Sequence, residues 1–167
     1  MKTETRQAIV ALTIPTPDGV FVARYSKDGL CRLDFPGKTA DAEASRRIPP
    51  EVRHWHSLTG LVLKTALKGR PIGELPPLDL KAGTVFQQKV WKCLKRIRTG
   101  QTWTYGEVAE AIGSKTAFRA VGGACGANPI PVLVPCHRVL AANQRLGGFS
   151  GGLEWKKLLL QREGISM

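Results

Sequence analysis

Cysteine and histidine are scarce in this chain, which has four cysteines and three histidines among 167 residues. No two cysteines have Cys-x-x-Cys spacing, so the usual zinc-ribbon signature is excluded. The sequence also lacks a Gly-rich phosphate-binding loop and any set of metal ligands with recognisable spacing. It therefore predicts a protein that works without a metal or a cofactor.

Long apolar runs are also missing, since none approaches the ~20 residues that a membrane-spanning helix needs. Residues 1–6 lead into a short alternating segment and not into the hydrophobic region of a signal peptide. A hydrophobic content of 43% supports a packed core. We therefore expect a soluble, intracellular protein that does not contact membranes.

Acidic residues are half as frequent as basic ones, 13 against 25, which gives a formal charge of +12. Residues 80–167 hold 13 basic and 4 acidic residues, whereas residues 1–79 hold 12 and 9. Such an excess favours a polyanionic partner, and nucleic acid is the leading candidate. Charge alone leaves RNA and acidic protein surfaces as alternatives to DNA.

The first half of the chain has the pattern of a small sheet. Extended segments at residues 7–14, 20–25 and 30–35 are separated by turn sequences and predict a three-stranded meander. The first turn is expected at Pro15–Gly19, which has Pro-Asp-Gly chemistry. Residues 36–52 are rich in proline, alanine and charge, and predict a loop.

A helix and a proline-rich segment follow the predicted sheet. Apolar residues at helical spacing predict a helix over His54–Leu67, ended by Gly69. Residues 70–83 contain three prolines and are expected to link two domains. We therefore predict a scaffold domain over residues 1–79 and a second domain over residues 80–167.

The second half predicts mostly helices. A helix is expected from Thr84 to Ile97, and a short one from Thr104 to Ile112 that begins with a capping box. Ser114 is expected to cap a further helix running through Ala124, which would complete a helix-turn-helix. Leu153–Glu163 predicts the last helix.

Cys136 and His137 are adjacent in the run Pro-Cys-His-Arg-Val. A free thiol titrates near pH ~8.5 and needs a nearby base to become a nucleophile. Neighbours on an extended segment point to opposite sides, so the chain must turn there or a water must bridge the two side chains. A buried cysteine beside an unrelated histidine is the alternative interpretation of the dipeptide alone.

Seven blocks of the second half occur in an order known from one family. They are Gly83–Gln87, Val90–Trp91, Thr104–Ala109, Arg119–Ala124, Asn128–Val139, Gly147–Gly152 and Leu159–Gly164. In these blocks the chain closely resembles the alkylguanine-DNA alkyltransferases, also called methylated-DNA–protein-cysteine methyltransferases. The resemblance covers about half the chain, and the first eighty residues match more weakly.

The resemblance implies DNA repair by direct reversal. An alkyl group would pass irreversibly from 6-O-alkylguanine in DNA to the sulfur of Cys136, in a single turnover without a cofactor. 4-O-alkylthymine is a second candidate substrate. His137 would remove the thiol proton through a water, Glu163 would orient His137, and Asn128 would tie the turn before the cysteine to the helix pair.

The resemblance also implies how double-stranded DNA is bound. The second helix of the helix-turn-helix would enter the minor groove, and Arg119 would fill the gap left by a flipped base. Small residues such as Ala120 and Gly122 would let the helix approach the DNA backbone, although tight helix packing would explain them equally well. Tyr105 and Arg138 complete the expected DNA contacts.

Four residues are expected to contact the flipped guanine. Tyr105 would donate to N3 and Ser150 to the oxygen, and the Val139 carbonyl would accept from the exocyclic amine. Phe149 would form an apolar wall, where some relatives have tyrosine.

The family's fold is mixed α/β (α+β). A small ribonuclease-H-like sheet-plus-helix domain would precede a mostly helical, winged-helix-like domain in a monomer. Some relatives carry an N-terminal zinc, but here only Cys31, His54 and His56 could contribute, so no metal is expected. The expected location is the cytoplasm, at the nucleoid in a prokaryote, or the nucleus in a eukaryote.

Two other functions compete with repair. Lesion-sensing relatives bind damaged DNA without repairing it and carry tryptophan at the position of Cys136. A cysteine hydrolase using Cys136 and His137 would usually place these residues far apart in the sequence, and it would leave the basic second half unexplained.

Overall fold

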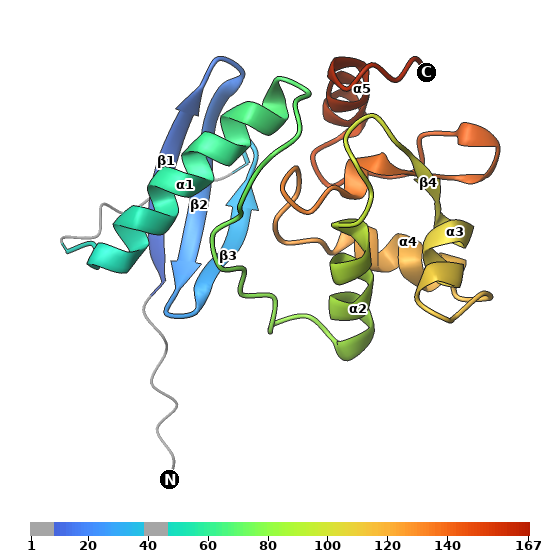
Figure 1. The fold of residues 1–167 in the computed structure, drawn as a ribbon, viewed down its shortest axis with the longest axis horizontal. Helices are drawn as coiled ribbons and strands as arrows, with labels where there is room; N and C mark the ends of the chain where they lie inside the picture. Colours follow the sequence, from blue (N-terminus) through green and yellow to red (C-terminus); the bar gives the residue numbers. More distant parts are fainter. Residues whose placement is uncertain (1–8, 39–46) are drawn as a thin grey trace, which may run out of the picture.

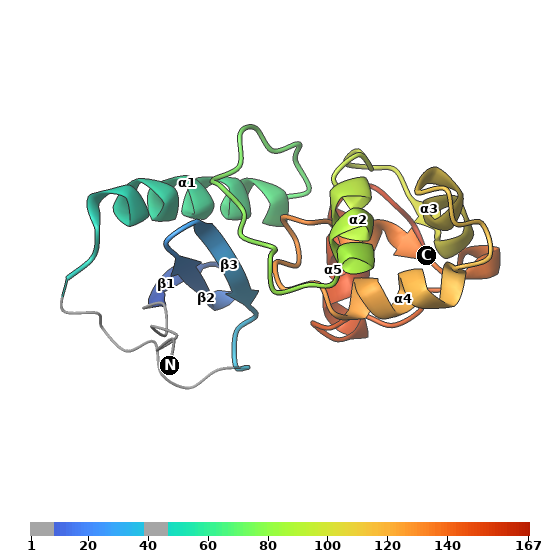
Figure 2. The ribbon, with the colours of Figure 1, turned by 90° about the horizontal axis from the view of Figure 1, so that it is seen from below.

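The computed structural model describes residues 9–38 and 47–167. Figures 1 and 2 show a small sheet covered on one face by a helix, beside a group of shorter helices. The expected mixed α/β fold is confirmed. The elements are β1 (Val10–Thr16), β2 (Gly19–Ser26), β3 (Gly29–Asp34), α1 (Pro50–Leu67), α2 (Val85–Leu94), β4 (Trp103–Thr104), α3 (Tyr105–Ala111), α4 (Phe118–Gly126), η1 (Cys136–Arg138), β5 (Val139–Leu140), η2 (Ala142–Gln144) and α5 (Leu153–Arg162).

We call residues 9–38 and 47–69 the sheet half, and residues 84–167 the helical half. The sheet is an antiparallel meander of order β1-β2-β3, as predicted, and α1 lies over it (Figure 2). The ribonuclease-H-like and winged-helix-like descriptions of the two halves stay predictions. Residues 7 and 8 of the first predicted strand, and residues 39–46 of the predicted loop, lie outside the described residues.

Two boundaries in the sheet half differ from the sequence prediction. The first turn is shorter than Pro15–Gly19, because Pro15 stays in β1 opposite Val20. β1 is an edge strand, where the missing N–H of a proline leaves no ladder bond unmade. Helix α1 begins at Pro50 and not at His54, because a proline in the first turn needs no hydrogen-bond partner for its nitrogen.

The proline-rich segment 70–83 packs closely against the sheet half. Leu30 N donates to the Pro77 carbonyl at 2.8 Å, and Asp79 N donates to the Leu30 carbonyl at 2.8 Å. Ser26 Oγ donates to Asp79 Oδ2 at 2.5 Å. The segment therefore covers the outer edge of β3, which satisfies backbone groups that would otherwise be open to another chain.

Capping residues set the starts of two helices in the helical half. Thr84 and Gln87 form a capping box at α2, and Thr104 and Glu107 form the predicted one at α3. The expected cap at Ser114 was wrong, because α4 begins four residues later. Residues 114–117 form a turn in which Ala117 N donates to the Ser114 carbonyl at 2.8 Å.

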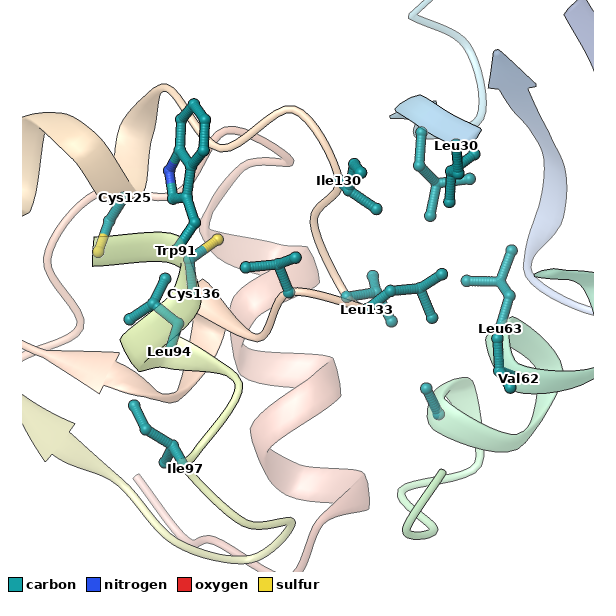
Figure 3. Close-up of a cluster of buried hydrophobic side chains, with 14 of the residues drawn as sticks. Leu30, Val62, Leu63, Trp91, Leu94, Ile97, Cys125, Ile130, Leu133 and Cys136 are labelled. Carbon is teal, nitrogen blue, oxygen red and sulfur yellow. The ribbon is translucent and has the colours of Figure 1, made fainter. Parts of the chain in front are cut away.

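One continuous apolar core joins both halves. Figure 3 shows Leu30 and Leu63 of the sheet half near Ile130 and Leu133, which belong to the segment that leads to Cys136. The backbone is tied at the same place, since Leu33 N donates to the Pro129 carbonyl at 2.9 Å. The segment that carries the cysteine is thus held between the sheet and the helices.

Candidate active site

Cys136 begins the short helix η1, and its side chain is buried at 3% exposure. The amide of Asn128 donates to its Sγ at 3.1 Å and to the Val134 carbonyl at 2.8 Å. Asn128 Oδ1 accepts from Ile130 N at 3.0 Å. Asn128 therefore fixes the turn before the cysteine and also donates to the sulfur itself.

Burial keeps the thiol protonated at rest. It raises the pKa of Cys136 to about 11, although the hydrogen bond from Asn128 and the charge of Lys156 act in the opposite direction. The amide donor and the ammonium both stabilise a thiolate once it forms. The site therefore needs a base to start a reaction and has groups ready to hold the resulting anion.

His137 is buried at 1% exposure and its Nε2 lies 2.8 Å from Glu163 Oε1. Burial lowers the pKa of His137, against the raising effect of Glu163, so the ring is neutral at pH 7. Because an ionised carboxylate can only accept, Nε2 carries the hydrogen and Nδ1 keeps its lone pair. Nδ1 has no hydrogen-bond partner among the described residues, which leaves it able to take a proton.

Glu163 is held ionised by two neighbours. Burial by itself would raise its pKa, but hydrogen bonds from His137 and Arg138 bring the pKa down to about 2. Arg138 Nε donates to Oε2 at 3.0 Å and Nη2 donates to Oε1 at 2.9 Å. Glu163 can therefore orient His137 over the whole physiological pH range.

The expectation that Arg138 contacts DNA does not fit this arrangement. The residue is 8% exposed, and its remaining donors bind the Ile97 carbonyl at 2.7 Å and Thr99 Oγ1 at 3.1 Å. All three nitrogens of the guanidinium therefore donate to partners inside the protein. Arg138 thus positions Glu163, and through it His137.

Lys156 is a buried residue of the site that the sequence analysis missed. It is 0% exposed, and its Nζ donates to the Val139 carbonyl at 2.7 Å and to the Gly148 carbonyl at 3.4 Å. Burial lowers its pKa, whereas the nearby cysteines raise it. Its spacing from the buried Leu159 and Leu160, three and four residues further along α5, was the signal that could have revealed it.

The Val139 carbonyl was expected to accept from the guanine amine. It already accepts the hydrogen bond from Lys156, so a second donor would share the same oxygen. Tyr105, Phe149 and Ser150 lie together around an open hollow of about 530 Å³ beside α4. We call it the α4 hollow, and Arg119 lies on it too.

The floor of the α4 hollow depends on a glycine. Gly147 has φ +64°, and a Cβ there would lie 2.6 Å from the Tyr105 hydroxyl oxygen. Burial raises the pKa of Tyr105, so its hydroxyl remains a hydrogen-bond donor at neutral pH. Only glycine therefore leaves this hydroxyl in place.

The outer face of α4 is open. Arg119 and Ala120 are exposed, Gly123 has nothing within 4 Å of where a Cβ would stand, and the nearest atom at Gly122 is Tyr105 Cε1 at 3.9 Å. Tight helix packing therefore does not explain Gly123. A face of this kind lets another molecule approach the helix backbone closely.

Aromatic rings connect the sheet half with the site. The Phe35 ring in the sheet half lies 5.7 Å from that of Phe149 and 4.9 Å from that of Trp155, centroid to centroid. Phe149 in turn lies 6.4 Å from His137. Lys38 Nζ also donates to the Ser150 carbonyl. The loop that lines the α4 hollow is thus packed on the sheet half.

Backbone strain accompanies the buried thiol. Val132, four residues before Cys136, has φ +73°, which is rare for a β-branched residue. Such conformations persist only where the surrounding packing fixes them, and they concentrate at functional sites.

No three His, Cys, Asp or Glu side chains in residues 9–38 and 47–167 are grouped so that they could hold a metal ion. Over the same residues, no helix is both long and apolar enough to cross a membrane.

Comparisons with known proteins agree with this geometry. The family described as "6-O-methylguanine DNA methyltransferase, DNA binding domain" matches residues 85–165. The methylated-DNA–protein-cysteine methyltransferase of Methanosarcina acetivorans is 52% identical over 95 residues, which cover 55% of this chain and 61% of that protein. The Haemophilus influenzae protein of the same name is 53% identical over 83 residues, 50% of this chain and 46% of that protein. These matches span less than two thirds of the curated relatives.

Solved structures match over more of the chain. The Mycobacterium tuberculosis O6-methylguanine methyltransferase is 36% identical, with a TM-score of 0.75 over 93% of both chains. The structure of the M. tuberculosis protein in complex with DNA is 35% identical, with a TM-score of 0.73 over 92% of both chains. The resemblance found in the sequence is confirmed, and the chain belongs to the 6-O-methylguanine DNA methyltransferase family.

Proposed function

We propose that the protein repairs DNA by moving an alkyl group from the 6-oxygen of guanine to Cys136. The observation that carries the proposal is the buried Cys136 thiol, which accepts a hydrogen bond from Asn128 beside the His137–Glu163 pair. Membership of the family supports the same reaction. We extend the proposal to 4-O-alkylthymine as a second substrate.

The reaction begins with proton removal from the thiol. His137 Nδ1 takes this proton through a water, and Glu163 stabilises the resulting imidazolium. The Asn128 amide and the Lys156 ammonium stabilise the thiolate. Loss of any one of these groups is expected to slow the reaction without changing its product.

The displacement then takes place at the alkyl carbon. A bond forms between this carbon and Cys136 Sγ while the bond from carbon to the guanine oxygen breaks, and its electron pair goes to the guanine. Tyr105 donates to N3 and Ser150 donates to the oxygen as this charge develops. The product is a thioether, which the residues of this site have no means to cleave, so each chain acts once.

DNA is bound through α3 and α4. The target atom lies inside the duplex, so the nucleotide has to be flipped out before it can react. We propose that α4 enters the minor groove with Arg119 in the vacated position and with Ala120 and Gly122 against the backbone. The protein acts as a monomer, with residues 80–167 as the binding and catalytic domain and residues 1–79 as its scaffold.

The test is the intact mass and peptide map of the protein after incubation with a duplex that carries one 6-O-methylguanine. We expect one methyl group per chain, located on the Cys136 peptide, and a restored guanine. Cys136→Ser is expected to bind the duplex and gain no methyl group. Cys31→Ser, which changes a cysteine outside the site, is the matched control and is expected to react like wild type. Binding without any mass gain by wild type would instead indicate a lesion-sensing protein.

A further inference from the structure

Phe118 is an exposed aromatic residue at the first position of α4. Its exposure is 49%, although phenylalanine is a residue type that folding usually buries. The Arg119 guanidinium lies 5.9 Å from the centre of its ring. Phe118 also lines the α4 hollow, together with Tyr105 and Phe149. An apolar ring therefore stands on the same hollow as Tyr105 and Phe149, which are proposed to contact the guanine.

The surroundings of Phe118 suit an approaching polyanion. The first turn of α4 contains no acidic residue, and within the described chain no side chain caps its N–H groups. These groups and the positive end of the helix dipole favour negative charge. Beyond the first turn, Gly122 and Gly123 have no side chains, so another molecule can approach the helix backbone closely there. A DNA backbone following this surface would bring its bases next to Phe118.

We propose that Phe118 is an apolar wedge that contacts the base step beside the flipped nucleotide. This inference rests on the proposed function. Arg119 alone fills the space of one base, while the neighbouring base loses a stacking partner when the nucleotide leaves. An apolar side chain inserted at a base step offsets part of this loss and kinks the duplex. Phe118 is the residue next to Arg119 and supplies such a side chain.

A competing role for Phe118 is to hold Arg119 through a cation–π contact. Leucine separates the two roles, because it keeps an apolar side chain of similar reach and has no π face. The wedge predicts that Phe118→Leu retains most of the function that Phe118→Ala loses. A purely cation–π role predicts that both variants lose the same amount.

The experiment compares single-turnover methyl transfer from a duplex and from free 6-O-methylguanine base. We expect Phe118→Ala to lower the ratio of the duplex rate to the free-base rate by about tenfold, equivalent to ~1.4 kcal/mol of transition-state stabilisation. Phe118→Leu is expected to restore most of the ratio. The matched control is Leu153→Ala, which removes a similarly exposed apolar side chain at the start of α5 and should leave the ratio unchanged.

A double-mutant cycle with Arg119→Ala decides whether Phe118 itself touches DNA. We expect Phe118→Ala to slow duplex transfer by at least about threefold even when Arg119 is absent. No further loss in that background would overturn the wedge, as would a duplex to free-base ratio equal to wild type in Phe118→Ala alone.

DNA distortion can be followed without the transfer reaction. In the Cys136→Ser background, 2-aminopurine placed next to the lesion should brighten on binding, and Phe118→Ala should reduce this signal. An equal signal in both proteins would contradict the wedge. The measurement is independent of the proposed chemistry, which would fail separately if wild type transferred no methyl group from the free base.

Discussion

The helical half and the sheet half contribute to the site in different ways. Every residue proposed to act on the substrate lies in the helical half, from Tyr105 to Glu163. The sheet half instead packs against the segments that hold those residues in place. One example is the Phe35 ring, which packs against the Phe149 ring. One half therefore supplies reactive groups and the other fixes where they stand.

The two kinds of contribution constrain the sequence differently. A thiol, its base and the carboxylate that orients the base have to occupy fixed positions, so the family's blocks are easy to recognise in the helical half. The sheet half supports the site through apolar side chains of suitable volume and a few polar contacts with the helical half. One such contact is the ion pair of Arg162 with Asp18, where Nη2 lies 2.7 Å from Oδ1. Many sequences can provide such support, which explains the weaker resemblance of the first eighty residues.

The largest effect is expected from Glu163→Gln in the helical half. The change removes the carboxylate that orients His137, and a positioned base contributes about 10²–10⁴-fold to a rate. It also leaves Arg138 buried without its charged partner, which costs about 3–5 kcal/mol of unfolding free energy. Single-turnover transfer and chemical denaturation measure the two effects. Glu154→Gln is the control, because Glu154 is exposed and lies in α5, the helix at whose C-terminal end Glu163 stands.

The acid stability of the wild type should depend on the same carboxylate. The pKa of Glu163 falls from an ordinary 4.5 to about 2 in the folded protein. Its contribution to stability is therefore complete above pH 4.5 and is lost as the pH falls toward 2. Glu163→Gln should lack this part of the acid transition, and an unchanged acid profile would contradict the role of the ion pair.

Phe35→Ala tests the supporting role of the sheet half. Phe35 is 3% exposed, and the truncation is expected to lower the free energy of unfolding by about 3–5 kcal/mol. Because the loop with Phe149 loses its packing, transfer from duplex and from free base should slow by the same factor. Phe35→Leu should cost less than about 1.5 kcal/mol and restore both rates. A selective loss with duplex would give the sheet half a direct part in DNA binding.

Asp18→Asn should have the smallest effect. The ion pair with Arg162 is partly exposed, so its loss should cost about 1 kcal/mol in urea denaturation and leave transfer by the folded protein unchanged. The hydrogen bond from Arg162 lowers the pKa of Asp18 below its usual 3.8. The ion pair's contribution to the free energy of unfolding is thus present at neutral pH and is lost as the pH falls through the lowered pKa of Asp18. A slower transfer would show that the pair also positions the adjacent Glu163.

The sequence predicted features that depend on neighbouring residues. The capping box at Thr104 stands where the sequence predicted it, because it depends on residues three positions apart. The start of α2 at Thr84 was predicted too, although its capping box was not. The predicted helix cap at Ser114 was wrong because residues 114–117 form a turn after α3 and do not belong to α4. The predicted start of α1 was wrong because a proline such as Pro50 is typical of a loop but also fits the first turn of a helix.

The remaining errors concern charged side chains that become buried. Arg138 and Lys156 belong to residue types that are usually exposed, and the resemblance implied that Arg138 contacts DNA. The partners that hold their charges lie 25 residues away for Arg138 and 17 residues away for Lys156, so no local pattern shows these hydrogen bonds. For Lys156 only its spacing from Leu159 and Leu160 indicated a buried position. The strained backbone of Val132 likewise comes from tertiary packing and has no signal in the sequence.

The central claim is that the buried Cys136 thiol is protonated at rest and that the neutral His137 removes its proton when the reaction begins. The pH dependence of transfer from free 6-O-methylguanine tests it most directly. We predict a rate that is constant from neutral pH toward the thiol pKa of about 11 and that falls only below pH 6.5, because burial lowers the pKa of His137 from that value. A rate that rises tenfold per pH unit from pH 6 to pH 9 would show that the thiol ionises without this base, and would contradict the account.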